Sequence, residues 1–365
     1  MTDSNENTKL DGISITILII SGVVILFSFF SPLIFVQESV IGLDFTTTGN
    51  IGDTIGGIMN PFIAISGVFL TFLAFYIQFK ANRLQRELFR EELDYNKFEN
   101  QFYEMLKLHK DNVNEIEIEQ VKLNVQNKAN GDKDLDSVEK IISGRKTFNF
   151  LKSEFEILYN IAKKHFPDKD PKTWVNEAYG VFFSGLSNFD TQEHAFSKEV
   201  SAVKTKHKEN HYTSLPDTIK ALVDANLHVK DNLRFNLFEG YSSQLAHYYR
   251  HLFQTVKFVV NQNGNMLSYN EKRKYLRILR AQLSNQEQAM LFYNWLSDFG
   301  NQWNNDKNKF FTDYRMIHNI YQELLVDEIK LNEIFEPEGN YLKEENRAFD
   351  PLFEFQDWKK QKANG

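Results

Sequence analysis

The chain contains no cysteine among its 365 residues. It therefore has no disulfide framework, no thiolate zinc site and no cysteine nucleophile, and this absence fits a reducing compartment. Proline is missing between positions 217 and 336, where only three glycines occur, a composition typical of helical segments. Acidic residues outnumber lysine and arginine, and the formal net charge of −7 argues against a protein that mainly coats nucleic acid.

Several catalytic signatures are missing as well. The chain has no GxxxxGKS/T, GxGxxG, HExxH or GxSxG motif. Helical ribonuclease toxins of the HEPN class carry an arginine, four to six residues and then a histidine, and no such arrangement occurs here. The sequence therefore predicts no cofactor and identifies no enzyme class.

Charged residues are also absent from two long apolar runs, 13–36 and 54–79. Each exceeds the roughly 20 residues needed to cross a bilayer. The first is longer than the apolar core of a secretory signal, and no small-residue cleavage site follows it. These features predict a two-helix transmembrane hairpin, with the lipid bilayer as a partner.

The charges around these runs predict their orientation. The segment between them, 37–53, contains no lysine or arginine, whereas four cations follow the second run: Lys80, Arg83, Arg86 and Arg90. Positive residues stay on the cytoplasmic side of the inner membrane. We therefore expect residues 1–12 and the chain after position 79 to lie in the cytoplasm.

Neither run contains an ionisable residue, which disfavours an ion or proton transporter. Small and kink-prone residues open the second run: Gly56, Gly57, Asn60 and Pro61. They are consistent with either a flexible interfacial segment or a close helix–helix or pore-lining contact.

The remainder predicts a mainly α fold, with an all-α cytoplasmic domain over 143–335. Apolar residues at helical spacing predict a juxtamembrane stalk over 80–126, which pairs with another copy or folds back on the domain. We expect a solvated loop over 124–137, a loop or short helices over 190–214, and a final amphipathic helix over 310–334. The tail, 336–365, carries apolar residues that indicate docking: Phe349, Leu352, Phe353, Phe355 and Trp358.

Two stretches, 238–260 and the segment that follows it to about position 296, form the centre of the predicted domain. Each has an apolar helix face and, beside it, a polar stripe. The first stripe is Gln244, His247, His251 and Gln254, and the second is Arg277, Arg280, Ser284 and Glu287. Because an unpaired buried polar group costs roughly 1–3 kcal/mol, these residues face solvent, satisfy one another or line a cavity.

His247 and His251 lie four residues apart, a spacing that can supply two metal ligands. A third ligand would have to come from elsewhere, with Glu239 or Glu287 as the nearest acidic candidates. Paired histidines beside aromatic residues are commonly structural, and we predict no metal.

Besides the two apolar runs, three segments resemble the putative phage abortive infection protein family, the AbiC-like group. They are Gly-Arg-Lys-Thr-Phe at 144–148, Phe-Glu-Gly-Tyr and His-Tyr-Tyr-Arg-His-Leu-Phe-Gln within 238–258, and Tyr-Leu-Arg-Ile-Leu-Arg-Ala-Gln-Leu-Ser-Asn-Gln-Glu within 275–294. The resemblance extends from about residue 10 to 325.

This resemblance implies a membrane-associated bacterial protein that stops phage multiplication at the expense of the infected cell. It makes the polar residues of the matching segments, with Glu239, the candidate functional cluster. These residues are His247, Arg250, His251, Arg277, Arg280, Gln282, Ser284 and Glu287.

Three functions remain open at this point. In the first, the cytoplasmic domain senses a phage component, and the hairpin assembles and damages the membrane. In the second, the domain is an RNA- or nucleotide-directed enzyme whose site forms where the two polar stripes converge, and the spans are a tether. In the third, the chain is a recruiting scaffold, with the stalk as a homo-oligomer seam. The sequence carries no strong nucleic-acid signal.

Overall fold

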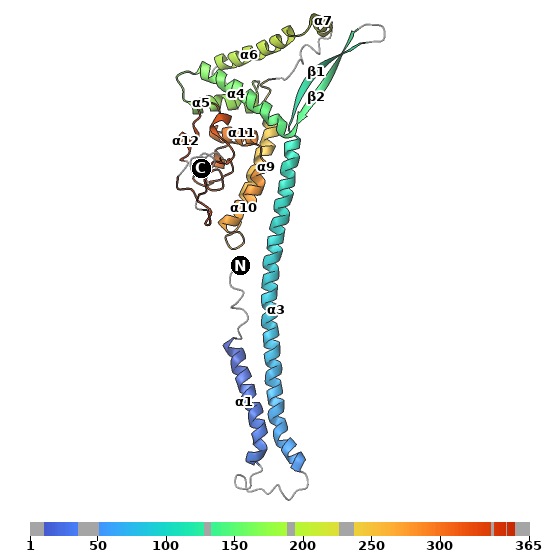
Figure 1. The fold of residues 1–365 in the computed structure, drawn as a ribbon, viewed down its shortest axis with the longest axis vertical. Coiled ribbons are helices and arrows are strands. Elements are labelled where there is room, and N and C mark those ends of the chain that lie inside the picture. The colour runs from blue at the N-terminus through green and yellow to red at the C-terminus, as the bar shows by residue number, and fades with distance from the viewer. Residues whose placement is uncertain are drawn as a thin grey trace, which may run out of the picture. The chain divides into compact units, whose positions relative to one another are not determined.

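The chain divides into two compact units, residues 1–97 and 98–365. The computed structural model describes residues 11–35, 51–127, 133–187, 194–225, 237–336, 339–347 and 349–354. Figure 1 shows the order of its elements, which begins with α1 (Gly12–Phe35) and the long α3 (Ile51–Asn114). The predicted mainly α fold is confirmed, with one β-hairpin as the exception among the described residues.

In the first unit, α1 and α3 contact each other through an aromatic pair and through polar groups at the start of α1. The rings of Phe27 and Phe62 lie 5.0 Å apart, edge to face. The buried residues of α1 are all serines, namely Ser14, Ser21, Ser28 and Ser31, and the Ser28 and Ser31 hydroxyls donate to carbonyls of their own helix. At the start of α1, Asp11 accepts hydrogen bonds from Tyr76 at 2.9 Å and from Lys80 at 3.2 Å.

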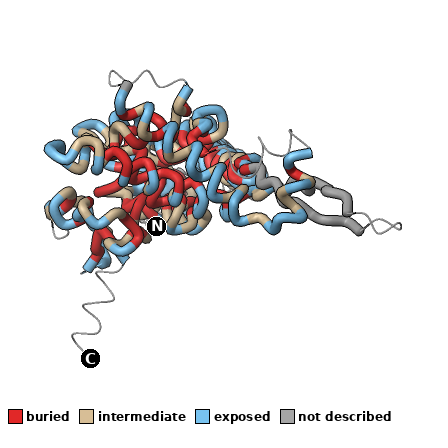
Figure 2. Tube along the Cα trace, turned by 90° about the horizontal axis from the view of Figure 1, so that it is seen from above, coloured by how far each residue is buried: buried red, intermediate tan, exposed pale blue. Residues whose placement is uncertain are grey.

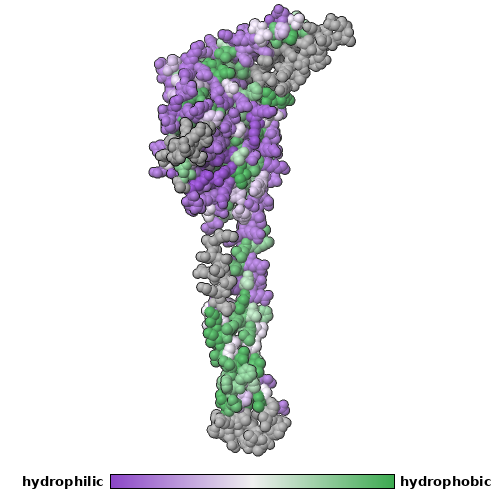
Figure 3. Space-filling model, in the orientation of Figure 1, coloured by the Kyte–Doolittle hydropathy of each residue, from purple (hydrophilic) through white to green (hydrophobic). Residues whose placement is uncertain are grey.

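The outer surfaces of these two helices are apolar. Figure 3 shows hydrophobic residues gathered over α1 and the first part of α3. Large side chains such as Val23, Leu33 and Phe75 are more than half exposed. By length and composition, both helices can cross a membrane.

A β-hairpin replaces the last part of the predicted stalk. Strand β1 (Glu117–Asn127) pairs antiparallel with β2 (Lys133–Ser143), so the predicted helix to residue 126 and the solvated loop over 124–137 are both wrong. Val121, Leu123 and Val125 alternate with polar residues, which is the period of a strand. The sequence between the strands contains Asn-Gly, a dipeptide typical of hairpin turns.

The 3-10 turn η1 (Gly144–Lys146) leads from the hairpin into the helices of the second unit. These are α4 (Thr147–His165), α5 (Pro171–Ser184), α6 (His194–Thr213), α7 (Asp217–Ala225), α9 (Ser242–Val260), α10 (Tyr269–Arg280) and α11 (Asn285–Leu296). The sequence predicted a loop or short helices over 190–214. This prediction is wrong, because α6 is a single helix of 20 residues. Phe196 and Val200, which are fully buried, anchor this otherwise polar helix.

Helix α11 lies at the centre of the core. Its residues 287–294 are all buried, and Figure 2 shows the buried residues concentrated in the helical part of the molecule. The apolar face predicted for α9 is confirmed, because Leu245, Leu252 and Val256 are fully buried. The second stretch was predicted as one helix, whereas the structure has two helices there, α10 and α11. They are separate because Ser284 and Glu287 form a capping box that starts α11.

The expected helix over 310–334 is wrong. Beyond Leu296 the described chain forms only short helical turns, η2 (Asn301–Trp303), η3 (Gln322–Leu324) and α12 (Leu331–Ile334). The Asn305 side chain accepts hydrogen bonds from two backbone N–H groups, which makes a turn, and Arg315 has a left-handed φ of 58°.

The tail docks as predicted over its described part. Leu352 and Phe353 are buried, whereas Phe349 is 42% exposed. Phe355 and Trp358 lie outside the described residues.

Two glycines allow the end of α5 to cross the segment before α9. Gly185 and Gly240 have φ values of 85° and 92°. A Cβ on Gly185 would lie 2.2 Å from the Glu239 carbonyl oxygen, and one on Gly240 would lie 2.4 Å from the Gly185 nitrogen. The crossing is closed by a hydrogen bond from the Leu186 N–H to the Phe238 carbonyl at 2.9 Å. Only glycine fits at both positions.

We predict that Gly185→Ala destabilises the second unit by about 3 kcal/mol or more, because the backbones must separate. Thermal unfolding of the detergent-solubilised chain measures this change. Gly264→Ala is the matched control, since a Cβ there meets no atom within 4 Å. Equal unfolding temperatures for the two variants would contradict the close crossing.

Candidate functional site

A groove runs between the C-terminal part of α3 and the polar stripe of α9, both in the second unit. Its larger cavity has a volume of about 560 Å³. The lining residues are Asn112, Glu115, Ile116, Ser243, Gln244, His247, Tyr248, Arg250, His251 and Gln254. All four predicted stripe residues of α9 are among them. The structure thus shows this stripe lining a cavity, one of the three alternatives left open above.

A second cavity of about 360 Å³ adjoins the first and shares Gln254 with it. Its other lining residues are Gln101, Met105, Lys257, Phe258, Asn261 and Gln262. The two cavities together are called the α3–α9 groove below. The groove extends along most of the length of α9.

One lining residue of the groove, His251, stacks on a buried histidine of α3 that does not line it. This residue, His109, is 1% exposed, and its ring centroid is 6.3 Å from that of His251. Among the described residues, neither ring nitrogen of either histidine has a hydrogen-bond partner. Burial, followed by repulsion from His251 when that ring is protonated and from Arg145, lowers the pKa of His109 to about 4. Burial also lowers the pKa of His251.

Both imidazoles are therefore neutral at pH 7, and each carries one donor and one acceptor that the described chain leaves unused. His109 was not among the predicted site residues, and no pattern within its own helix pairs it with His251.

Glu287 caps α11 and does not line the groove. Its carboxylate accepts hydrogen bonds from the Ser284 N–H at 2.7 Å and the Tyr248 hydroxyl at 3.3 Å. The Arg145 guanidinium lies 3.8 Å away and also donates to the Gln282 carbonyl at 2.5 Å. Burial raises the pKa of Glu287. Gln282, Ser284 and Glu287 thus join the start of α11 to α9 and to the end of the hairpin.

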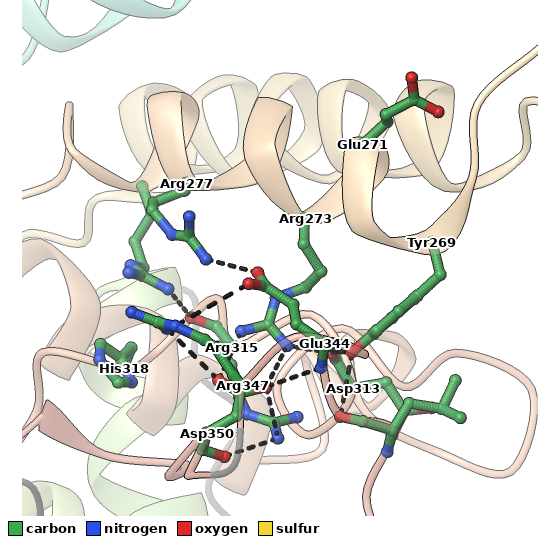
Figure 4. Close-up of polar contacts among 12 residues, drawn as sticks. Tyr269, Glu271, Arg273, Arg277, Asp313, Arg315, His318, Glu344, Arg347 and Asp350 are labelled. Atoms are coloured by element: carbon green, nitrogen blue, oxygen red, sulfur yellow. Dashed lines mark hydrogen bonds and ion pairs between the residues drawn. The ribbon is translucent and has the colours of Figure 1, made fainter. Parts of the chain in front are cut away.

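Arg277 lies against the C-terminal segment (Figure 4), whereas Arg280 contacts the chain at Arg315. Arg277 forms an ion pair with Glu344, and Arg280 donates to the Arg315 carbonyl at 3.0 Å. Burial, followed by the charges of Arg273 and Arg277, lowers the pKa of Arg280 to about 10. Neither arginine lines the α3–α9 groove. The two predicted stripes therefore contact different partners and do not converge on one site.

A buried ion cluster holds α10 against the C-terminal segment. Arg273 contacts both carboxylate oxygens of Asp350 at 3.0 Å, and Arg315 contacts the same side chain at 3.3 Å. All three residues are at most 3% exposed. They lie 35 and 77 positions apart in the chain, so no local pattern could have paired them.

We predict that Asp350→Asn destabilises the second unit by about 3–5 kcal/mol, because the buried Arg315 loses its counter-ion and Arg273 keeps only the longer contact with Glu344 at 3.7 Å. The urea midpoint of unfolding measures this effect. Asp306→Asn is the control: its ion pair with Lys309 is exposed, so a change below about 1 kcal/mol is expected. If Asp350→Asn were as stable as the control, the cluster would not hold the tail in place.

Glu239, the remaining acidic candidate, lies on the surface and pairs with Lys204 at 2.6 Å. It does not join His247 and His251. Within the described ranges no group of three or more His, Asp or Glu side chains could hold a metal ion.

The residues predicted to open the second span all lie within α3. A Cβ added to Gly56 or Gly57 would meet no atom within 4 Å. Neither glycine is therefore needed for close packing against the described part of the chain. Pro61 lies inside the helix, where it removes one backbone hydrogen bond.

Sequence reasoning missed a buried carboxylate, Glu154 of α4, which is 5% exposed. It accepts hydrogen bonds from the Phe238 N–H at 2.9 Å and the Tyr241 hydroxyl at 2.7 Å. Burial raises its pKa from 4.5 to about 7, although these two donors oppose the shift. Glu154 therefore links α4 to residues 238–241, the segment that crosses the end of α5.

Because the folded protein binds this proton more tightly than the unfolded chain, stability is lost as the pH rises from 4.5 to about 7. Over that pH range the free energy of unfolding falls by at most about 3 kcal/mol. We expect the unfolding temperature of the wild-type chain to fall over this range. Glu154→Gln should flatten the profile, as followed by thermal unfolding in a pH series. A variant as pH-dependent as the wild type would exclude Glu154 as the cause.

Comparison with known proteins identifies one related family. Residues 240–325 match the model of a family described as putative phage abortive infection protein. The resemblance predicted from the sequence is confirmed over this segment, which contains α9, α10 and α11. No curated protein and no solved structure matches the chain.

Proposed function

We propose that this protein is a membrane-anchored phage-resistance protein of the abortive infection type. The observation that carries this proposal is the family match over residues 240–325, which includes the groove wall α9 and the core helix α11. The two apolar helices of the first unit support membrane anchoring.

The charges next to these helices support the orientation. Lys80, Arg83, Arg86 and Arg90 follow the second span, so the helical unit and both termini are cytoplasmic in this proposal. The helical unit senses a phage component, and the hairpin then assembles and permeabilises the inner membrane. The absence of ionisable side chains from both spans favours such a lytic role over selective transport.

The cysteine-free chain allows a direct test of the orientation. We expect Asp44→Cys to react with a membrane-impermeant maleimide in intact spheroplasts, and Arg90→Cys to react only after lysis. The opposite pattern would exclude the proposed orientation, and labelling of both positions in intact spheroplasts would exclude spanning.

We further expect that the wild-type chain lowers the plating efficiency of a sensitive phage and collapses the membrane potential before lysis. Val23 is 59% exposed on α1, so Val23→Arg removes little internal packing, whereas a charge at mid-membrane costs about 3 kcal/mol. This variant should lose both effects, whereas Val23→Leu should keep them. A potential-sensitive dye follows the collapse. Growth arrest at an intact potential would exclude membrane damage.

A further inference from the structure

We propose that the α3–α9 groove binds an extended acidic peptide segment of about eight residues from a partner protein. This inference deepens the proposed function, since the peptide would be the infection signal. It starts from the length of the groove. The lining residues of α9 and the turn after it extend from Ser243 to Asn261. At 1.5 Å per residue this distance is about 27 Å, the length of about eight residues in extended conformation.

The polar groups of the groove suit a peptide backbone. Amide side chains occur along both walls: Gln101, Asn112, Gln244, Gln254, Asn261 and Gln262. Each amide both donates and accepts, as does each peptide unit of a bound chain. The ring of His251 lines the middle of the groove, and its nitrogens are buried.

The charges of the groove specify the side chains of the peptide. Arg250 and Lys257 line it, and the described residues provide neither with an ion pair. They are seven residues apart on one helix face, or about 10 Å. An extended chain points every second side chain to the same face, so carboxylates two or four residues apart, about 7 or 13 Å, bracket this spacing. Glu115 at the far end favours a basic residue there.

The same charges disfavour a nucleic acid. Single-stranded nucleic acids bind in strongly positive grooves. This groove holds two cations and one carboxylate, and the lining His251 is neutral because burial lowers its pKa. Met105, Ile116 and Phe258 supply apolar contacts for alternate peptide side chains.

The test uses the full chain in lipid nanodiscs and a displayed library of random twelve-residue peptides. We expect the selection to enrich peptides with two acidic residues two or four positions apart. Calorimetric titration of a synthetic selected peptide should show about tenfold weaker binding to Gln254→Ala and to Arg250→Gln, because each variant loses one or two hydrogen bonds. Lys274→Ala, an exposed change on α10, is the control and should bind like the wild type.

The inference is overturned if no peptide is enriched, or if the selected peptides bind Gln254→Ala and Arg250→Gln as tightly as the control. It is also overturned if a labelled twelve-nucleotide oligothymidine binds more tightly than any selected peptide and loses affinity in the same two variants. If Val23→Arg loses protection as expected but the wild-type groove binds no peptide, only this inference is refuted. Groove binding in a chain that protects against no phage would refute only the proposed function.

Discussion

The carboxylate of Glu287 holds together the centre of the helical unit. It caps the first turn of α11, accepts a hydrogen bond from Tyr248 of α9, and lies next to Arg145 at the end of the hairpin. A fully buried carboxylate is tolerated only when its oxygens are hydrogen-bonded. These three partners come from three different elements. The position of α9, and hence one wall of the groove, depends on satisfying this one side chain.

Charge is distributed unequally between the two sides of the helical unit. On the side of α10, arginines are satisfied within the chain by Glu344, Asp350 and backbone carbonyls, and most of these contacts are buried. On the side of α9, Arg250 and Lys257 are exposed, and His109 and His251 keep unused ring nitrogens. Residue type alone did not distinguish these cases. The partners show that the first set is structural, whereas Arg250 and Lys257 remain exposed along the groove.

Local periodicity predicted what depends on contacts within a helix. The two apolar helices and the buried face of α9 follow from patterns of a few residues. The hairpin was missed because the helical spacing of apolar residues in the predicted stalk, 80–126, obscures the strand-like alternation of Val121, Leu123 and Val125 at its end. The helix expected over 310–334 fails because Arg315 adopts a left-handed conformation to reach Asp350. The groove was unpredictable in detail, since its two walls are more than 100 positions apart.

The paired capping boxes also bear on how the chain folds. Ser268 with Glu271 and Ser284 with Glu287 each start a helix through contacts only three residues apart. The costly step of helix formation is the first turn, and a local cap lowers that cost before any tertiary partner is present. Contacts of such short sequence separation form early. Helices α10 and α11 can therefore nucleate during synthesis, ahead of the distant tail residues that later surround α10.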